Sequence, residues 1–472
     1  MSGWEASRVA AAAGAELLWE GMSGPGSAPP RAAVDTRALA PGELFVGLPG
    51  EREDGGARAG EALSAGAWGV LVSPEHAARA VAGARERGEG AVLAHPNPLS
   101  GLQRLAGAWR DELAGRGARV VAITGSTGKT STKDILAALL AAAMPTASSP
   151  QNLNTEVGLP LAILAAPAAT RALVLEMAMR GPGQIAELTA IARPHVGVIV
   201  NVGPAHLELL GSVEAIAAAK AELIAGLEAG AVAVVPADEP LLAPHLREDV
   251  RTIAFGEGGA VRLLGREEGG VVTIDDDGRR LRLVPSFSQA HNMSNLLAAV
   301  AAAGALGVQP PERLDVSFSA MRGQRELLSS GVQLIDDCYN ANPMSMRAAI
   351  DDLATSPHEG RLVAVLGDML ELGSEGAAFH REIGAHAARA GVDLLVTVGP
   401  LAAEMGQAFG GSSRALEDAA AAAAAVPPML RAGDTVLLKG SRGVGLERVG
   451  AALRDGNGSA ALSAAPSLPG QR

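Results

Sequence analysis

Apolar positions in the middle of the chain follow two alternating patterns. Short runs of apolar and β-branched residues, typical of buried strands, lie at residues 119–124, 172–177, 196–200 and 231–235. The segments between them, such as residues 213–228, carry apolar side chains at helical spacing. Strands that alternate with helices in this way predict a parallel sheet with right-handed crossovers. Two later runs, at residues 271–274 and 281–284, predict an antiparallel appendage to it.

The same alternation returns in the last third of the chain. Strand-like runs lie there at residues 332–335, 362–366, 394–398 and 435–438. They predict a second, Rossmann-like sheet with helices between its strands. The alanine run 419–425 predicts one of those helices, whereas the small and polar residues 456–472 predict a loose tail.

The first part of the chain is different, because a helical segment precedes only short strand-like runs at residues 43–47 and 69–72. It predicts a small α/β domain. The expected fold class is therefore α/β with three domains. A small N-terminal domain covers residues 1–112, a central P-loop parallel-sheet ATPase domain covers 113–312, and a C-terminal Rossmann-like domain covers 313–455.

Composition agrees with this division and excludes several classes of partner. A chain of 472 residues is too long for one hydrophobic core. Its formal net charge of −12, without a run of Lys or Arg, argues against nucleic acid as a partner. The sequence shows neither a signal-peptide pattern nor a continuous apolar stretch of about 18 residues, so no membrane insertion is predicted. The single cysteine, Cys338, excludes an intramolecular disulfide. We expect a cytoplasmic monomer.

A glycine-rich turn between a strand and a helix is the most informative local feature. Residues 123–131 read ITGSTGKTS, with apolar residues before them and a helix-favouring segment, 129–143, after them. Backbone N–H groups of such a turn face a polyphosphate at the start of the helix. Lys129 is placed to neutralise its outer oxygens and Thr130 to bind its magnesium. The predicted binding residues are Gly125, Ser126, Thr127, Gly128, Lys129, Thr130 and Ser131. A tight turn that binds nothing is the alternative.

Two polar residues follow later strands of the same predicted sheet. Glu176 ends the apolar run 172–175, where a carboxylate lies on the ligand side of an open parallel sheet and is able to hold a metal ion. A solvated glutamate at a strand end is the alternative. His206 follows the strand at 196–200, and its imidazole is able to complete a metal site or to bind an acyl oxygen. Taken alone, it is equally a satisfied loop histidine.

Lys220 lies within the apolar stripe of a predicted helix. The stripe consists of Val213, Ile216, Leu223, Ile224 and Leu227. A lysine on this face either extends its ammonium to the surface or stays buried with a lowered pKa. A neutral amine of that kind reacts with carbon dioxide to give a carbamate, which is an anionic metal ligand. Both interpretations remain open.

Strand ends in the C-terminal region predict a second ligand site. The segment IDDCYNANP, residues 335–343, follows a strand and precedes a helix. Asp336 and Asp337 either bind a ligand there or only cap the turn. The segment KGSRGVGLE, residues 439–447, also follows a strand, and its Lys439, Ser441 and Arg442 suit a carboxylate or a phosphate.

Taken in order, these segments resemble the Mur ligases of peptidoglycan synthesis. The similar segments are residues 35–50, 123–136, 151–160, 176–185, 201–212, 217–223, 290–299, 336–346, 366–373 and 439–447. Two of them, DDCYNANPMSM and LGDMLELG, are similar to the members that add D-alanyl-D-alanine. The DNPR motif of the members that add a diamino acid is absent.

The resemblance implies a reaction and a set of roles. ATP phosphorylates the terminal carboxylate of a UDP-N-acetylmuramoyl-tripeptide, and the amine of D-alanyl-D-alanine attacks the acyl phosphate. The implied magnesium ligands are Thr130 and Glu176 for one ion and His206 and a carbamylated Lys220 for the other; Lys129, His206 and Lys220 form the catalytic set. The implied nucleotide contacts are Asn295, Arg325, Asp337, Tyr339 and Asn340. The implied substrate contacts are Asp35, Thr36 and Arg37 in the uridine-binding domain, and Asn152, Asn154, Lys439, Ser441 and Arg442 elsewhere.

Two other functions remain open from the sequence. One is a related ATP-dependent amide ligase, either another Mur ligase or an enzyme similar to folylpolyglutamate synthase. The other is a nucleotide-binding scaffold without catalytic activity. The combination of Lys129, Glu176 and Lys220 disfavours the scaffold, because a protein that only binds a nucleotide does not need a site for two metal ions.

Overall fold

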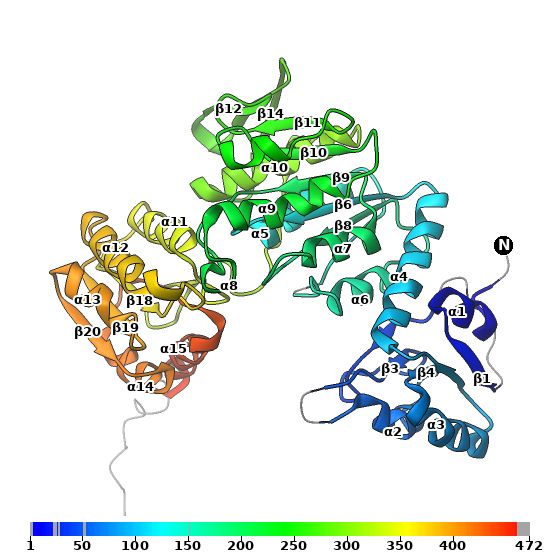
Figure 1. Cartoon of the computed structure of the whole chain (residues 1–472). Helices are drawn as coiled ribbons and strands as arrows, with labels where there is room; N and C mark the ends of the chain where they lie inside the picture. The colour runs from blue at the N-terminus through cyan, green and yellow to red at the C-terminus, as the bar shows by residue number, and fades with distance from the viewer. Residues whose placement is uncertain (1–2, 22–25, 27–28, 51–52, 151, 460–472) are drawn as a thin grey trace, which may run out of the picture.

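Within the residues that the computed structural model describes, which are 3–21, 26, 29–50, 53–150 and 152–459, three β-sheets follow one another along the chain (Figure 1). Each sheet carries helices against its faces, so the predicted α/β class is confirmed. No helix in this described part combines the length and the apolar character that are needed to cross a membrane.

The first sheet has strands in the order β1 (Glu16–Glu20), β5 (Ala91–Ala94), β4 (Gly69–Val72), β3 (Leu44–Val46) and β2 (Ala32–Ala33). Strand β1 is antiparallel to β5, and the other pairs are parallel. Residues of α2 (Ala59–Ser64) and α3 (Pro74–Arg87) form one apolar cluster with this sheet. Residues of α1 (Ala6–Ala13) and α4 (Pro98–Gly115) form a second one.

Helix α4 leads from the first sheet to the second (Figure 1). Its apolar residues Leu105 and Trp109 are fully buried in a cluster that also contains Leu159 and Ile163 of α6 (Gly158–Leu164). The Trp109 indole donates a hydrogen bond to the carbonyl oxygen of Ala166, at 3.0 Å. The helix therefore packs against both layers, which fixes how the N-terminal sheet is attached to the central one.

The second sheet carries the glycine-rich turn at the end of an inner strand, third from one edge. Its strand order is β15, β14, β13, β12, β11, β10, β9, β6, β8, β7. Strand β6 (Arg119–Thr124), which precedes the turn, pairs in parallel with β8 (Ala172–Glu176) and β9 (Val196–Ile199). Helices α5 (Lys129–Ala141) and α10 (Ala290–Ala305) share the apolar cluster on one face of the sheet. Helices α7 (Gln184–Ala192) and α9 (Val213–Ala225) belong to the cluster on the other face.

The predicted antiparallel appendage continues the central sheet and is not separate from it. Strands β10 (Val232–Pro236) and β11 (Arg251–Phe255) are parallel, and β12 (Val261–Arg266), β13 (Val272–Asp276) and β14 (Arg279–Pro285) follow as an antiparallel extension. The edge strands are β7 (Thr146–Ser148) and β15 (Arg313–Leu314). The sequence pattern missed β12 because its residues are alternately buried, exposed and half-buried, which leaves no continuous apolar run.

The third sheet has the order β16 (Gln324–Leu327), β17 (Gln333–Asp336), β21 (Thr435–Lys439), β18 (Leu362–Gly367), β19 (Leu394–Val398) and β20 (Ser413–Leu416). All its pairs except β16–β17 are parallel. Helices α11 (Pro343–Ala354), α12 (Gly376–Arg389) and α13 (Ala403–Phe409) share one apolar cluster with it. Helices α14 (Ala419–Ala425) and α15 (Glu447–Ser459) share the other.

Two elements lie across the predicted domain limits. Helix α4 spans the limit between residues 112 and 113, and strand β15 pairs with β14 of the central sheet although it begins at Arg313. Helix α15 runs to Ser459, so residues 456–459 of the predicted tail are helical. Residues 460–472 lie outside the described part of the chain. The division at residues 112 and 312 stays a prediction.

Candidate active site

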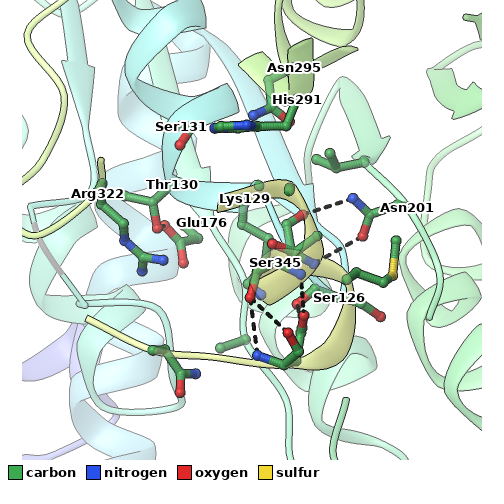
Figure 2. A pocket seen from close by; sticks show the side chains of 18 of the residues that line it. Ser126, Lys129, Thr130, Ser131, Glu176, Asn201, His291, Asn295, Arg322 and Ser345 are labelled. Atoms are coloured by element: carbon green, nitrogen blue, oxygen red, sulfur yellow. Dashed lines mark hydrogen bonds between the residues drawn. The ribbon is translucent and has the colours of Figure 1, made fainter. Parts of the chain in front are cut away.

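A cavity of about 1010 Å³ lies where the central and C-terminal sheets meet. The glycine-rich turn and the ends of β8 and β9 line it from the central sheet. The segment 337–345 and residues Lys439 and Arg442 line it from the C-terminal sheet. Figure 2 shows the central part of this cavity, with Lys129, Thr130 and Glu176 among its lining side chains.

Two glycines give the turn its shape. Gly128 has φ +78°, which favours glycine, and a Cβ atom there would lie 2.5 Å from Oδ1 of Asn295. Gly125 has φ +157°, and a Cβ atom there would approach Cβ of Val200 to 3.0 Å. Helix α5 begins directly after Gly128, so its first N–H groups point toward the cavity. The end of α5 therefore provides the partial positive charge that attracts a phosphate.

Asn201, which follows β9, is hydrogen-bonded to the backbone of the turn. Its Oδ1 accepts a hydrogen bond from the backbone N–H of Thr127 at 2.9 Å, and its Nδ2 donates to the Thr127 carbonyl oxygen at 3.1 Å (Figure 2). The Ser126 hydroxyl donates to the carbonyl oxygen of Gly203 at 2.9 Å. These contacts hold the turn in its conformation. Asn201 is not among the residues predicted from the sequence. The feature that indicates it is its position at the end of a strand next to β6.

Lys129 is folded back on the turn. Its Nζ donates to the carbonyl oxygen of Gly125 at 2.8 Å. Burial lowers the pKa of Lys129, the nearby Glu176 carboxylate raises it, and the positive charge of Arg322 lowers it further. An anionic ligand in the cavity has the opposite effect to burial, because a negative charge favours the ammonium form. A phosphate in the cavity would therefore raise the pKa of Lys129 and stabilise its ammonium form.

Thr130 and Glu176 are joined by a hydrogen bond. The Thr130 hydroxyl donates to Oε2 of Glu176 at 2.8 Å, and Nδ2 of Asn154 donates to Oε1 at 2.8 Å. Both Thr130 and Glu176 are buried at the wall of the cavity. The carboxylate therefore has a fixed orientation and lies beside a hydroxyl, which are two of the oxygen ligands that magnesium prefers.

A buried lysine takes part in the hydrogen-bond network around the strand end that carries Glu176. Nζ of Lys133, one turn after Lys129, donates to the carbonyl oxygen of Ser149 at 2.9 Å and lies 3.1 Å from Oδ1 of Asp134. The Ser149 hydroxyl in turn accepts a hydrogen bond from the backbone N–H of Glu176 at 3.2 Å. This network positions the strand end that carries Glu176. The sequence analysis did not single out Lys133.

His206 contacts the C-terminal part of the chain. Its Nδ1 lies 2.5 Å from Oε2 of Glu371, and its ring lines the cavity. Burial lowers the pKa of His206, the hydrogen bond with Glu371 raises it, and the charges of Lys129 and Lys220 lower it. A neutral imidazole is the form that binds a metal ion.

Lys220 is buried, with 2% of its surface exposed. Burial lowers its pKa well below the ordinary value, and the nearby charge of Lys129 adds to this effect. Among the described residues, no hydrogen bond or ion pair involves its amine. The amine of Lys220 does not extend to the surface. Lys220 is also not among the residues that line the cavity. A neutral buried amine without a partner is the state from which a carbamate forms.

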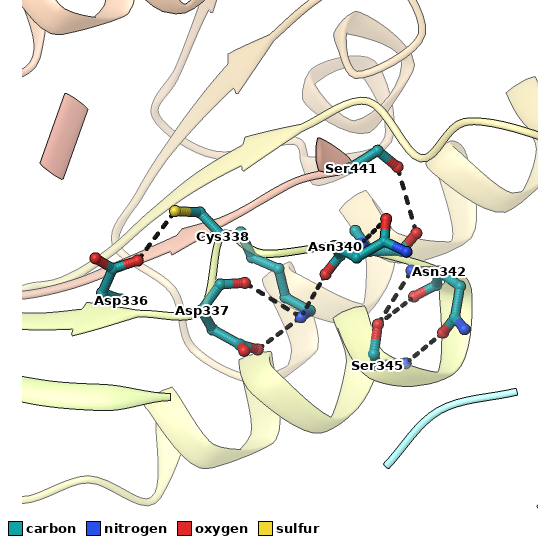
Figure 3. Close-up of polar contacts among 9 residues, drawn as sticks. Asp336, Asp337, Cys338, Asn340, Asn342, Ser345 and Ser441 are labelled. Carbon is teal, nitrogen blue, oxygen red and sulfur yellow. Dashed lines mark hydrogen bonds and ion pairs between the residues drawn. The ribbon is translucent and has the colours of Figure 1, made fainter. Parts of the chain in front are cut away.

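Lys439 organises the loop after β17. Its Nζ donates to Oδ2 of Asp337 at 2.6 Å and to the carbonyl oxygen of Asn340 at 3.2 Å (Figure 3). The Ser441 hydroxyl accepts a hydrogen bond from the backbone N–H of Leu370 at 2.9 Å and contacts the carbonyl oxygen of Ala341. Asp336 accepts a hydrogen bond from the Cys338 thiol at 3.0 Å, so it faces away from the cavity (Figure 3). Lys439 and Ser441 therefore hold strand ends together.

A second cavity of about 390 Å³ adjoins the first. Arg325 lines it but is paired with Asp352 at 2.7 Å and with Ser356 at 2.9 Å. Arg322 lines both cavities, and its guanidinium lies 4.0 Å from the centre of the Tyr339 ring. No ion pair of Arg322 occurs among the described residues. The sequence analysis missed Arg322, because an arginine three positions before Arg325 carries no motif of its own.

Most of the predicted residues lie around these two cavities. The large cavity is lined by Ser126, Thr127, Gly128, Lys129, Thr130, Ser131, Asn152, Asn154, Glu176, His206, Asn295, Asp337, Tyr339, Asn340, Lys439 and Arg442. Gly125, Lys220 and Ser441 line neither cavity, and Arg325 lines only the second cavity. Asp35, Thr36 and Arg37 lie in the turn after β2 of the first sheet, outside both cavities, with Arg37 paired to Asp35. Their roles stay predictions.

Comparison with known protein families gives two matches. The Mur ligase middle domain matches residues 123–303. The family described as Mur ligase, glutamate ligase domain, matches residues 321–442. The two matches cover the second and third sheets, and so both walls of the large cavity.

Full-length relatives extend the similarity to the first sheet. The chain is 36% identical over 431 residues to the UDP-N-acetylmuramoyl-tripeptide–D-alanyl-D-alanine ligase of Bacillus subtilis, covering 88% of this chain and 91% of that protein. It is 31% identical over 444 residues to the enzyme of the same name from Escherichia coli, covering 89% and 93%.

Solved structures agree with these sequence similarities. MurF from Acinetobacter baumannii superposes with a TM-score of 0.82 and 28% identity, covering 96% of this chain and 99% of that one. MurF ligase from Thermotoga maritima in complex with ADP gives a TM-score of 0.76 and 29% identity, covering 91% and 98%.

Proposed function

This chain belongs to the Mur ligase family, and from that premise we infer that it joins D-alanyl-D-alanine to a UDP-N-acetylmuramoyl-tripeptide in an ATP-dependent reaction. The observation that carries this conclusion is the cavity between the central and C-terminal sheets. The phosphate-binding turn forms one wall of it, and the DDCYNANP loop forms the opposite wall. A nucleotide and an acceptor amine therefore meet in one enclosed space.

We propose that the glycine-rich turn and Lys129 bind the phosphates of ATP. The N-terminus of α5 directs its N–H groups at them, and the Lys129 ammonium leaves the Gly125 carbonyl oxygen to neutralise their outer oxygens. Charge that develops during phosphoryl transfer is stabilised mainly by such positioned cations. Arg322 is the second positioned cation, because it lines the same cavity and forms no ion pair with any residue in the described part of the chain.

The residues present fit the magnesium that the family uses. Thr130 and Glu176 would hold the first ion as an oxygen pair, with Asn154 bonded to the carboxylate and Ser149 to the backbone N–H of Glu176. His206 and a carbamate on Lys220 hold the second. When bound, magnesium neutralises phosphate charge and orients the transferred group. The donor set is incomplete without the carbamate, because an unmodified lysine offers no anionic ligand.

The chain's own contribution to amide formation is placement. The terminal carboxylate of the tripeptide becomes an acyl phosphate, the amine of D-alanyl-D-alanine attacks its carbonyl carbon, and inorganic phosphate leaves. Asn152 and Asn154 orient the tripeptide from the central sheet, and Arg442 faces it from the C-terminal sheet. Asn295, Asp337, Tyr339, Asn340 and Arg325 enclose the nucleoside. Holding both reactants in line accounts for most of the expected rate enhancement.

We also propose that the first sheet binds the uridine nucleotide through Asp35, Thr36 and Arg37, and that the enzyme acts as a cytoplasmic monomer. A buried, unpaired Cys338 and the use of ATP support a reducing compartment.

Phosphate release from ATP tests the proposed reaction. With UDP-N-acetylmuramoyl-tripeptide present, we expect release only when D-alanyl-D-alanine is added, with a pentapeptide product of matching amount by mass spectrometry. D-glutamate, a diamino acid or L-glutamate as acceptor should give no release above background. Release with L-glutamate and a folate substrate would instead assign the chain to the alternative class of ligase.

A further inference from the structure

Glu371 connects the C-terminal sheet to the proposed metal ligand His206. It lies in the loop after β18, and its Oε2 is 2.5 Å from Nδ1 of His206, which follows β9 of the central sheet. The backbone carbonyl oxygen of Glu371 accepts a hydrogen bond from the N–H of Glu208 at 3.1 Å. Side chain and backbone therefore contact the same short segment around α8 (Leu207–Leu210) of the central region.

The backbone of both contact residues is in the left-handed region. Glu371 has φ +62° and His206 has φ +59°. This conformation is uncommon for residues other than glycine, because Cβ crowds the following carbonyl oxygen, although asparagine, aspartate and histidine adopt it more often than glutamate does. Strain of this kind persists where surrounding contacts require one particular side-chain direction. Here it directs an imidazole and a carboxylate at each other across two parts of the chain.

The hydrogen bond fixes which imidazole nitrogen is available to a ligand. An ionised carboxylate only accepts hydrogen bonds, so Nδ1 of His206 carries the hydrogen. Nε2 of the neutral ring then holds the free electron pair, and the ring lines the large cavity. In metalloenzymes, a carboxylate that binds the remote nitrogen of a histidine orients the ring and increases its basicity. The second carboxylate oxygen lies 4.0 Å from Nε of Arg180, which also helps to fix its position.

We propose that Glu371 is a positioning residue that orients His206 for the second magnesium ion, so that this ion site is complete only while the loop after β18 is docked on α8. The inference rests on the proposed function, because it takes His206 as a metal ligand. As a consequence, the metal site is assembled only when the loop after β18 of the C-terminal sheet docks on α8. Glu371 belongs to LGDMLELG, a segment for which the sequence analysis assigned no residue role.

Three variants separate orientation from folding. Glu371→Gly removes the carboxylate and also relieves the left-handed backbone, so the fold should not be destabilised. Glu371→Gln keeps an oxygen that accepts a hydrogen bond from Nδ1. Glu375→Gln is the matched control, because Glu375 is exposed, lies four residues further on and makes no contact with His206.

The readout is manganese binding in the presence of a non-hydrolysable ATP analogue and UDP-tripeptide. Pulsed electron paramagnetic resonance detects nitrogen hyperfine coupling when an imidazole binds Mn²⁺. We expect that coupling in the wild type, in Glu375→Gln and in Glu371→Gln. In Glu371→Gly it should be lost or strongly reduced, with Mn²⁺ binding at the weaker site roughly 10- to 100-fold weaker and an unchanged melting temperature.

Two results would overturn the inference in different ways. If Glu371→Gly keeps the full imidazole coupling and the wild-type Mn²⁺ affinity, Glu371 does not position His206, and the proposed function is unaffected. If the wild type itself shows no imidazole coupling although it turns over substrate, His206 is not a metal ligand. That result removes both the inference and the assignment of His206 within the proposed site.

Discussion

At Lys220, the proposed role as a metal ligand conflicts with the stability of the fold. Its amine is buried without a partner, and burial lowers its pKa. If the amine carries a carbamate, Lys220→Ala should be nearly inactive, and acetate or propionate should restore part of the activity by filling the vacated anionic position. Phosphate release at increasing carboxylate concentration measures this rescue. Lys220→Arg should not respond, because its guanidinium stays charged and fills the site. An Ala variant with the wild-type rate would exclude a role as ligand.

The same burial predicts that replacing Lys220 by an apolar residue raises stability, although the replacement is expected to lower activity. Because the folded-state pKa of Lys220 lies well below its ordinary value of 10.5, the unfolded chain binds, between these two pKa values, a proton that the folded chain does not bind. Stability contributed by this site therefore rises with pH between the two values. In buffer without bicarbonate or magnesium, Lys220→Met should melt higher than the wild type at pH 7, by roughly 2–4 °C per kcal/mol gained. The difference should shrink toward pH 10, and thermal melting across that range tests it.

At the scale of the element, the start of α11 serves both folding and binding. Oδ1 of Asn342 caps the helix by accepting a hydrogen bond from the Ser345 N–H at 2.9 Å. Nδ2 of the same side chain donates to the carbonyl oxygen of Ser126 in the phosphate-binding turn, at 3.2 Å. One amide thus stabilises a helix of the C-terminal sheet and ties it to the central sheet.

Substitution at Asn342 separates its two roles. Asn342→Ala removes both hydrogen bonds and should cost about 1 kcal/mol of stability. Asn342→Asp keeps the cap but loses the donor and places a negative charge beside the proposed phosphates, so stability should stay nearly unchanged while KM for ATP rises roughly 10-fold or more. Denaturant unfolding and steady-state kinetics measure the two effects.

The control for Asn342→Asp is Asn97→Asp. Asn97 caps α4 through the Ser100 N–H at 3.2 Å and lies outside both cavities. The control variant should leave KM for ATP at the wild-type value. An equal KM in Asn342→Asp and the wild type would show that the link to Ser126 has no part in nucleotide binding.

At the scale of the whole molecule, the proposed substrate contacts are spread over separate bodies. The first and third sheets lie on different sides of the central sheet (Figure 1), and Asp35, Thr36 and Arg37 lie outside both cavities. A tripeptide anchored on the first sheet must reach the phosphates at the centre. We therefore expect the chain to close around its ligands.

Small-angle scattering tests this closure. The radius of gyration should fall when a non-hydrolysable ATP analogue and UDP-tripeptide are both saturating, and fall less with either one alone. Lys129→Ala should show a weaker response to the ATP analogue, because it lacks the proposed phosphate contact. An unchanged radius in the wild type with both ligands at saturation would contradict the expected closure.

The sequence by itself determined features that depend on neighbours along the chain. The phosphate-binding turn is of this kind, because the conformation of Gly128 and the start of α5 are local properties. So are the strands of the parallel sheets, whose burial on both faces leaves continuous apolar runs such as Ala172–Glu176. For Lys220, the apolar stripe left two interpretations open, a surface ammonium or a buried amine, and the structure shows the side chain buried.

Only the tertiary structure decided which distant residues meet. The bonds from Asn201 to the turn and from Glu371 to His206 join residues 74 and 165 positions apart, and no local pattern specifies such pairs. It also showed that Lys439 is already bonded to Asp337, and that Arg322 has no such partner among the residues that the structure describes. A side chain's type and spacing indicate what it is able to bind. What it does bind depends on the groups that folding brings close to it, because a hydrogen bond needs its donor and acceptor within about 3 Å of each other.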